Sequence, residues 1–286
     1  MRILLTGRKG QVGWELERSL APLGEVAAFC HRDLDLADPG IIVARIRDVK
    51  PHVIVNAAAY TAVDKAETET GLAMAINGRA PGILAEEAVR LDALLVHYST
   101  DYVFDGAKSA PYTEDDEPHP INEYGRSKLA GERAIQATGC RHLILRTSWV
   151  YAARGNNFLI TMLRLARERP ELRVVGDQFG APTWARHIAD ATAILLGKIG
   201  ADRERATGVF HLTAAGETSW HGFAKAILGE TGSSTPVVEI PTSGYPTPAR
   251  RPANSRLEGR RLSETWQISL PGWEHGLRQC VGERVA

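Results

Sequence analysis

The sequence has few cysteines and no long hydrophobic run. Its three cysteines, Cys30, Cys140 and Cys280, are far apart and form no CxxC pair. This pattern argues against a disulfide scaffold and against a cysteine-based zinc site. No hydrophobic run approaches the roughly 18 residues of a membrane-spanning helix, and the amino-terminal strand and glycine turn do not resemble a signal peptide. We therefore expect a cytoplasmic protein with no membrane partner.

The chain also lacks net charge. Its 34 basic and 34 acidic side chains cancel, so no long-range field would attract nucleic acid or an anionic membrane. Hydrophobic residues make up 44% of the chain and charged residues 24%, which is ordinary for a globular protein and argues against disorder. We expect a soluble enzyme in which any anion-binding site is local.

The first half of the sequence alternates short hydrophobic segments with segments of helical spacing. The predicted strands are residues 2–6, 25–29, 52–57, 93–99 and 142–147, and the predicted helices are residues 12–20, 41–49, 72–90 and 124–138. Strands that are hydrophobic throughout are typical of a sheet covered on both faces. The alternation therefore predicts an α/β fold with a Rossmann-type, doubly wound parallel sheet.

The second half is less regular. Helices are predicted at residues 157–169, 185–197 and 220–231, with a short strand at 209–213. Five prolines between residues 236 and 252 predict loops rather than another sheet layer. We therefore expect a dinucleotide-binding domain over residues 1–155 and a smaller, mainly substrate-binding lobe over residues 156–286, some segments of which can return to the first domain.

A GxxGxxG turn follows the first strand. Gly7 permits a tight turn, Gly10 lets the backbone approach a pyrophosphate, and Gly13 lets the helix pack on the strand. Any strand-to-helix turn can use glycines, but this position favours dinucleotide binding. The second strand ends without the acid that binds an adenosine ribose. Arg32 lies there instead, either to bind the 2′-phosphate of NADPH or as a solvated charge, and NADH remains open.

The fourth strand and the helix after it carry a catalytic pattern. Thr100 lies at the carboxyl end of the strand, and the spacing of four places Tyr124 and Lys128 on one helical face. A phenol beside an ammonium can protonate an alkoxide, and we expect Lys128 to lower the pKa of Tyr124 towards the working pH. YxxxK alone is a weak signal. The signal becomes strong when YxxxK follows the glycine turn and the strand-end hydroxyl in this order. The small Ala58 and Ala59 after the third strand fit the same pattern.

These residues resemble the extended short-chain dehydrogenases, and in particular the dTDP-4-dehydrorhamnose reductase family. The resemblance extends over nearly the whole chain, through VIVNAAAYTAVDKAE, HYSTDYVFDG, YGRSKLAGE, RTSWVYA, DQFGAPT and YPTPARRPANSRL. It implies NADPH- or NADH-dependent reduction of the 4-keto group of dTDP-4-dehydro-β-L-rhamnose to dTDP-L-rhamnose. Thr100, Tyr124 and Lys128 would be catalytic, and Asp101 and Trp149 would face the sugar, although Trp149 could equally be a core aromatic. The cofactor contacts would be Gly10, Gln11, Val12, Asp35, Leu36, Ala59, Tyr60, Thr61, Tyr98, Tyr124 and Lys128.

Some relatives in this family are thought to dimerise through magnesium held by glutamates. Glu15 matches one such position, but Arg186 stands where another acid would be needed. Three hard oxygen ligands cannot be assembled in this way. We therefore expect no metal site, an exposed Glu15, and either a monomer or a homodimer.

Two rival functions remain. Another nucleotide-sugar reductase, epimerase or dehydratase could share the fold, but dehydratases usually carry a second carboxylate where Tyr102 follows Asp101. A noncatalytic regulatory subunit is disfavoured by the intact catalytic set. Near the end of the chain, Arg250, Arg251 and Arg256 are candidates for binding the substrate pyrophosphate, and Arg256 is the first choice.

Overall fold

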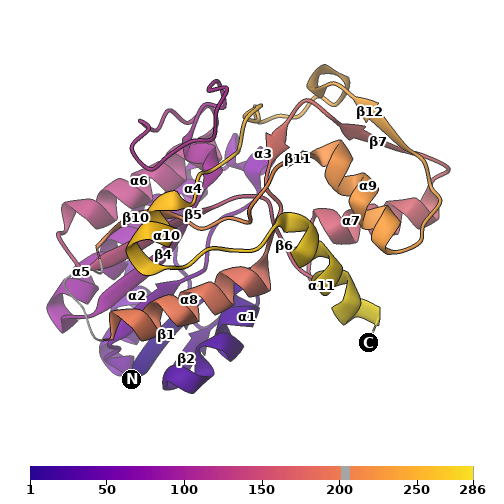
Figure 1. Ribbon diagram of the computed structural model, residues 1–286. Coiled ribbons are helices and arrows are strands. Elements are labelled where there is room, and N and C mark those ends of the chain that lie inside the picture. The colour runs from indigo at the N-terminus through magenta and orange to yellow at the C-terminus, as the bar shows by residue number, and fades with distance from the viewer. Residues whose placement is uncertain (201–206, 286) are drawn as a thin grey trace.

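The centre of the molecule is a six-stranded parallel sheet, and the computed structural model describes residues 1–200 and 207–285. The strands lie in the order β10–β5–β4–β3–β1–β2, and all neighbours are parallel (Figure 1). This order reverses direction beside β1, which confirms the predicted doubly wound α/β fold. The strands are β1 (Arg2–Thr6), β2 (Glu25–Phe29), β3 (Val53–Asn56), β4 (Leu94–Thr100), β5 (His142–Thr147) and β10 (Gly208–His211).

Helices cover both faces of the sheet because successive strand side chains point to opposite sides. On one face Ile3 and Leu5 belong to a core with side chains of α1 and α8, and on the other face Leu4 joins a core with α2, α5 and α6. The helices are α1 (Gln11–Ser19), α2 (Pro39–Val49), α5 (Ala80–Leu91), α6 (Glu123–Ala137) and α8 (Ala185–Ile199).

The helix predicted over residues 72–90 is divided. It comprises α4 (Thr70–Ala73), a π-helical segment (Met74–Arg79) and α5. A Cβ added to Gly131 of α6 would lie 2.1 Å from the carbonyl oxygen of Asn77, so α6 packs directly on the π-helical segment. The side chain of Asn77 then bonds both backbone groups of Tyr60. The irregular turn thus ties the loop after β3 to the helix that carries Tyr124.

A smaller part of the molecule is built from helices and short strand pairs (Figure 1). Its core includes Leu159, Phe223, Trp273 and Leu277. The expectation of loops throughout the proline-rich stretch is wrong in part, because β12, between Pro236 and Pro241, pairs in parallel with β7. The elements are α7 (Phe158–Glu168), α9 (Trp220–Glu230), α11 (Trp273–Val285), β7 (Leu172–Val175), β12 (Val237–Ile240), and the pairs β6 (Val150–Tyr151) with β9 (Thr183–Trp184) and β8 (Phe179–Gly180) with β11 (Thr218–Ser219).

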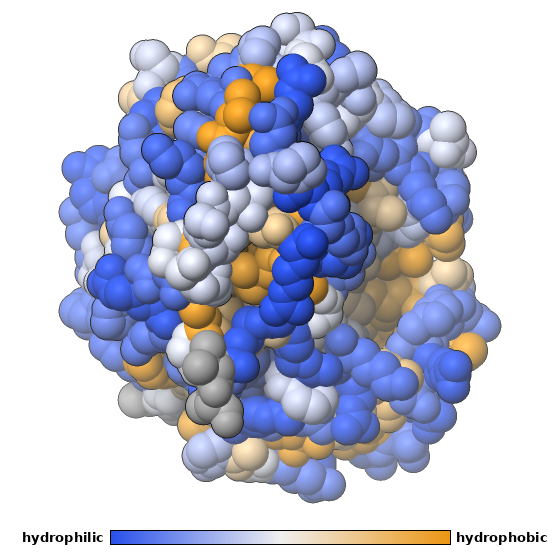
Figure 2. Space-filling view, turned by 90° about the vertical axis from the view of Figure 1, so that its right-hand side faces the viewer, coloured by the Kyte–Doolittle hydropathy of each residue, from blue (hydrophilic) through white to orange (hydrophobic). Residues whose placement is uncertain are grey.

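Segments from the second half of the chain also complete the central sheet. β10 forms one edge beside β5, and α8 packs on α1, while short α10 (Arg260–Trp266) contributes Leu262 and Trp266 to the core on that face. Residues 201–206 and 286, within the predicted second domain, lie outside the described residues. The molecular surface is hollowed right of centre in Figure 2, and hydrophobic residues lie in the hollow. None of the described helices is long and hydrophobic enough to cross a membrane.

Candidate active site

The turn from β1 into α1 depends on two glycines, Gly7 and Gly13, where any side chain would cause strain. Gly7 has a φ of +76°, and a Cβ there would lie 2.8 Å from the backbone nitrogen of Ala58. A Cβ on Gly13 would lie 2.1 Å from the carbonyl oxygen of Gly7. Gly10 is the N-cap of α1 and supplies no capping side chain. The first N–H groups of α1 are therefore available for an anion.

One polar side chain beside this turn has an unpaired hydrogen-bond acceptor. Gln11 begins α1, and its buried Oε1 has no hydrogen-bond partner among the described residues. Val12 follows it, half-buried, and the loop at Gly155 approaches the Gln11 side chain. Ala58, Ala59 and Tyr60 are half-buried beside the turn and Thr61 is exposed. These residues fit a dinucleotide whose polar groups would meet the helix end and Gln11.

The segment that follows β2 contains one arginine, Arg32, and two aspartates, Asp33 and Asp35. Arg32 is exposed and forms no ion pair within the described part of the chain. Asp33, which the sequence reasoning overlooked, returns to the strand end and accepts hydrogen bonds from the nitrogen and Sγ of Cys30, which hold the pKa of its carboxyl below the ordinary value. Asp35 is half-buried, whereas Leu36 is 5% exposed and belongs to the core under the sheet.

The predicted catalytic side chains converge at the end of β4. Thr100 is its last residue, and its hydroxyl donates to Asp101 Oδ1 at 3.0 Å and lies near the Tyr124 hydroxyl. Tyr124 lies in the first turn of α6, which begins at the Asn122 cap. One turn later Lys128 is buried, and its Nζ donates to the carbonyl oxygen of Tyr98 at 2.6 Å. The structure thus brings the strand-end hydroxyl, the phenol and the lysine to one edge of the sheet.

The pKa values at this site differ from the expectation. Burial raises the pKa of Tyr124 and Asp101 raises it further, while the Thr100 hydrogen bond opposes both effects. Burial lowers the pKa of Lys128 to about 8, although Glu132 acts in the opposite direction. The expected lowering of the Tyr124 pKa by Lys128 is not found, because loss of hydration dominates both groups. Tyr124 therefore keeps its proton at neutral pH.

Asp101 is a buried carboxyl with spare capacity. It is 3% exposed, and its Oδ2 has no partner among the described residues. Burial raises its pKa to about 6, although hydrogen bonds with Ser255 and Thr100 act against this shift. A free oxygen beside Thr100 and Tyr124 can accept a hydrogen bond from a ligand hydroxyl.

Trp149 belongs to an aromatic stack rather than to a core. It is half-buried with a φ of +48°, and its ring lies parallel to that of Trp220 with 3.6 Å between centroids. Phe158 in turn packs against the ring of Trp220. A Cβ on Gly180 would lie 2.6 Å from the Trp149 ring, so this glycine leaves room for the stack.

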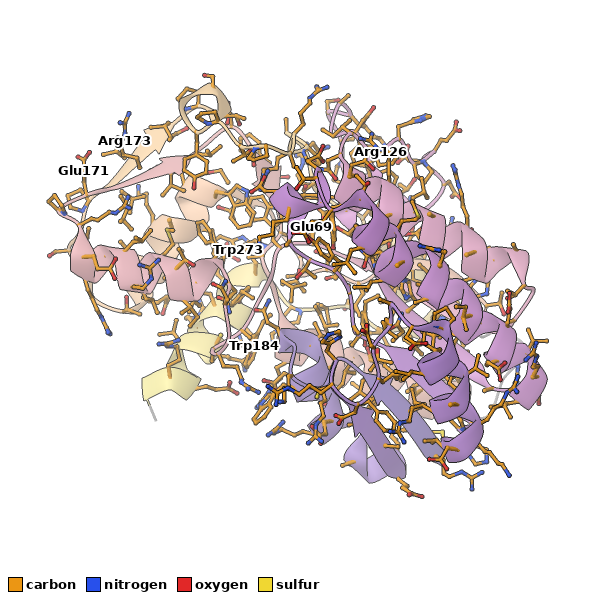
Figure 3. The ribbon with its side chains drawn as sticks, turned by 180° about the vertical axis from the view of Figure 1, so that it is seen from behind. Glu69, Arg126, Glu171, Arg173, Trp184 and Trp273 are labelled. Carbon is orange, nitrogen blue, oxygen red and sulfur yellow. The ribbon has the colours of Figure 1, made fainter. Side chains whose placement is uncertain are left out.

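The labelled side chains in Figure 3 mark both parts of the molecule and the region where they adjoin. Figure 3 shows Trp184 and Trp273 in the middle of the view, between the sheet and the smaller part. Glu69, which accepts a hydrogen bond from the Tyr60 hydroxyl, lies on the side of the larger part that faces the smaller one. Glu171 and Arg173 lie at the far end of the smaller part.

The three arginines between residues 250 and 256, the candidates for binding the pyrophosphate, have different surroundings. Arg256 donates to Asn254 Oδ1, to the carbonyl oxygen of Ser109 and to Glu217. Arg251 forms a two-pronged ion pair with Asp64. Arg250 is exposed, and its guanidinium has neither a hydrogen bond nor an ion pair within residues 1–200 and 207–285. Arg250 is thus the least committed cation of this segment.

Glu15 is not the exposed residue that we expected. It is 5% exposed and accepts hydrogen bonds from Arg186 at 3.1 Å. The packing of α1 on α8 brings Glu15 to Arg186, which also pairs with Glu283 of α11 at 2.8 Å. Among the described residues no group of three histidine, cysteine or acidic side chains is placed to hold a metal ion.

Two buried polar residues near Lys128 escaped the sequence reasoning as site residues. His97 Nε2 lies 3.2 Å from Lys128 Nζ, and Asn56 contacts the other ring nitrogen of His97. The signal was a polar residue within each of the hydrophobic segments VIVN and LLVHYST. Tyr98, an expected cofactor contact, directs its hydroxyl to Thr192 on the opposite face of the sheet.

The comparisons with known proteins agree along the full chain. The family model described as RmlD substrate binding domain matches residues 1–285. A dTDP-4-dehydrorhamnose reductase of Burkholderia thailandensis is 54% identical, with 100% of both chains covered, and one of Salmonella typhimurium is 46% identical, with 99% and 98% covered. A crystal structure of dTDP-4-dehydrorhamnose reductase from Bacillus anthracis in complex with NADP superimposes with a TM-score of 0.92 at 35% identity and covers 99% of both chains. The chain therefore belongs to the dTDP-4-dehydrorhamnose reductase family.

Proposed function

We propose that this chain reduces the 4-keto group of dTDP-4-dehydro-β-L-rhamnose to dTDP-L-rhamnose, with NADPH as the preferred hydride donor. The observation that carries the proposal is the convergence of Thr100, Tyr124 and Lys128 at the carboxyl edge of the sheet, beside the uncapped end of α1. The names of its relatives support the choice of sugar nucleotide. Free, buried cysteines support a reducing compartment, the cytoplasm, and the enzyme acts as a monomer or a homodimer.

The cofactor would bind across the glycine turn and supply the hydride. Gly7, Gly10 and Gly13 leave the space, and the first N–H groups of α1 would meet the pyrophosphate. Gln11 has an unused acceptor there. The remaining proposed contacts are Val12, Asp35, Leu36, Ala58, Ala59, Tyr60, Thr61, Tyr98, Tyr124 and Lys128, with Arg32 at the 2′-phosphate.

Tyr124 would protonate the oxygen of the reduced carbonyl. Reduction at a carbonyl carbon leaves an alkoxide, which is a much stronger base than a phenolate. A phenol with a raised pKa therefore still gives up its proton to it, and remains protonated until it is needed. The Thr100 hydroxyl would donate to the same oxygen and polarise the carbonyl beforehand.

The substrate would lie between the end of β4 and the smaller part of the molecule. Asp101 would accept a sugar hydroxyl at its free Oδ2, and the Trp149 ring would form one wall of the sugar site. Arg256 is the first candidate for binding the pyrophosphate, but its guanidinium already donates hydrogen bonds to Asn254 and Glu217. We therefore include Arg250, whose guanidinium is exposed, as the second candidate.

The proposal is tested by NADPH oxidation with the purified keto sugar nucleotide. Tyr124→Phe should lower kcat by about a hundredfold or more, because the proton donor is lost, while circular dichroism shows an intact fold. Tyr245→Phe, at an exposed tyrosine, is the matched control and should behave as the parent. A parent protein that binds dTDP but oxidises no NADPH would support the regulatory-subunit alternative, and undiminished activity of Tyr124→Phe would remove this tyrosine from the mechanism.

A further inference from the structure

Three buried polar side chains cross the central sheet in one row. Thr6 pairs with Asn56 in the register of β1 with β3, and Asn56 pairs with His97 in the register of β3 with β4. Each is at most 1% exposed, and the row two residues earlier on the same face is hydrophobic. Polar groups buried in this way need partners within the protein.

The hydrogen bonds along this row have a defined direction. The chain begins at the backbone N–H of Ala58, which can only donate, and it donates to Thr6 Oγ1 at 3.1 Å. The Thr6 hydroxyl then gives its proton to Asn56 Oδ1 at 2.7 Å. This orients the Asn56 amide so that Nδ2 faces His97 Nδ1 at 2.9 Å. Because an amide nitrogen only donates, Nδ1 accepts, and a neutral His97 carries its proton on Nε2.

This direction has a consequence for Lys128. Its Nζ lies 3.2 Å from His97 Nε2 and 2.6 Å from the carbonyl oxygen of Tyr98. An ammonium has donors only, so an ammonium facing an N–H of His97 would set two donors against each other. A neutral amine instead accepts from His97 and donates to Tyr98. Every polar atom named along this chain of bonds is then satisfied.

We propose that His97 is a positioning residue that presents its Nε2–H to Lys128 and thereby stabilises the neutral amine form of this lysine relative to the ammonium. The inference rests on the proposed function, in which Lys128 serves the catalytic tyrosine. A lysine whose pKa lies near the working pH is partly neutral and can accept a proton, whereas an ordinary lysine is already fully protonated at that pH.

The surrounding charges are compatible with this role. Burial lowers the pKa of both His97 and Lys128. On α6, Glu132 raises the pKa of Lys128, but Arg146 of β5 binds that carboxylate through two hydrogen bonds at 3.0 and 2.6 Å. Tyr124, one turn earlier on α6, and Asp101, after β4, are the other titratable groups at this end of the site.

The first test is the tautomer of His97. The cofactor-free protein, labelled with nitrogen-15 in histidine, is studied by two-bond nitrogen–proton correlation at neutral pH, and His97→Phe identifies the signals. The proposal requires the neutral form with the proton on Nε2. A proton on Nδ1, or a doubly protonated ring, would overturn it. The tautomer itself is measured on the parent protein, and the variant serves only to assign the signals.

The second test is the pKa of Lys128, measured by titration of carbon-13-labelled lysine, with Lys128→Met to identify the signal. His97→Leu changes no charge and removes the N–H that stabilises the neutral amine, so the pKa of Lys128 should rise by about one unit. Were His97 an acceptor for an ammonium, the same change would lower this pKa. A fall or no change therefore contradicts the proposal.

A control variant separates this effect from a general change in packing. Thr192→Val alters a buried hydroxyl on the opposite face of the sheet and should leave the pKa of Lys128 unchanged. Both measurements are made without cofactor or substrate. They consequently decide the role of His97 even if the chain fails to reduce the keto sugar, so the two proposals fail separately.

Discussion

Asp101 links the stability of the fold to pH. It is 3% exposed, and burial raises its pKa from 3.8 to about 6 against the hydrogen bonds of Ser255 and Thr100. Because the pKa is higher in the folded protein than in the unfolded chain, folding favours the protonated form. The associated stabilisation is fully present below pH 3.8 and is lost as the pH rises through 6.

The size of the effect follows from these two pKa values. At about 1.4 kcal/mol for each pKa unit, the shift corresponds to about 3 kcal/mol, most of which is lost between pH 4 and pH 7. Asp101→Asn has nearly the same shape and cannot ionise. The stability of the variant relative to the parent should therefore increase with pH by about 2 to 3 kcal/mol over this range.

Thermal unfolding of both proteins between pH 4 and pH 8 measures this difference. For a chain of this size, the Tm of the variant minus that of the parent should rise by on the order of 5–10 °C. Asp48→Asn, at a side chain that is 75% exposed, is the control and should show a nearly constant difference. A constant difference for Asp101→Asn as well would refute the raised pKa.

Three further predictions concern other charged groups. Glu132→Gln leaves the buried guanidinium of Arg146 without its partner and should lower the free energy of unfolding by about 3–5 kcal/mol, measured with urea; a loss below about 1 kcal/mol would contradict this. Arg32→Ala should raise the KM for NADPH about tenfold and leave that for NADH unchanged, whereas equal effects would make Arg32 merely structural. Arg250→Ala and Arg256→Ala, compared by calorimetry, should each raise the Kd for dTDP about tenfold if the residue binds the pyrophosphate, and unchanged affinity in both would exclude these two anchors.

Local features of the sequence were sufficient for the central sheet and the catalytic pattern. The predicted strands 2–6, 25–29 and 142–147 coincide with β1, β2 and β5, because short hydrophobic runs covered on both faces form parallel strands. The glycines of the first turn were also readable, since a positive φ or a backbone contact at Gly7 and Gly13 demands their type.

Other features depended on partners that are distant in the chain. The π-helical segment exists beside Gly131 of α6, and β12 pairs with β7 across more than one intervening element. Glu15 is buried because α8 brings Arg186 to it. No local pattern encodes these pairings.

The sequence by itself determined the α/β alternation, the glycine turn and the spacing that places Tyr124 and Lys128 on one helical face, because each depends on the geometry of a few consecutive residues. Only the tertiary structure decided the ionisation of the site. The pKa values of Tyr124, Lys128 and Asp101 are shifted by burial, and the row from Thr6 to His97 exists only because three strands align in register. Loss of hydration and the direction of hydrogen bonds arise when distant segments pack together.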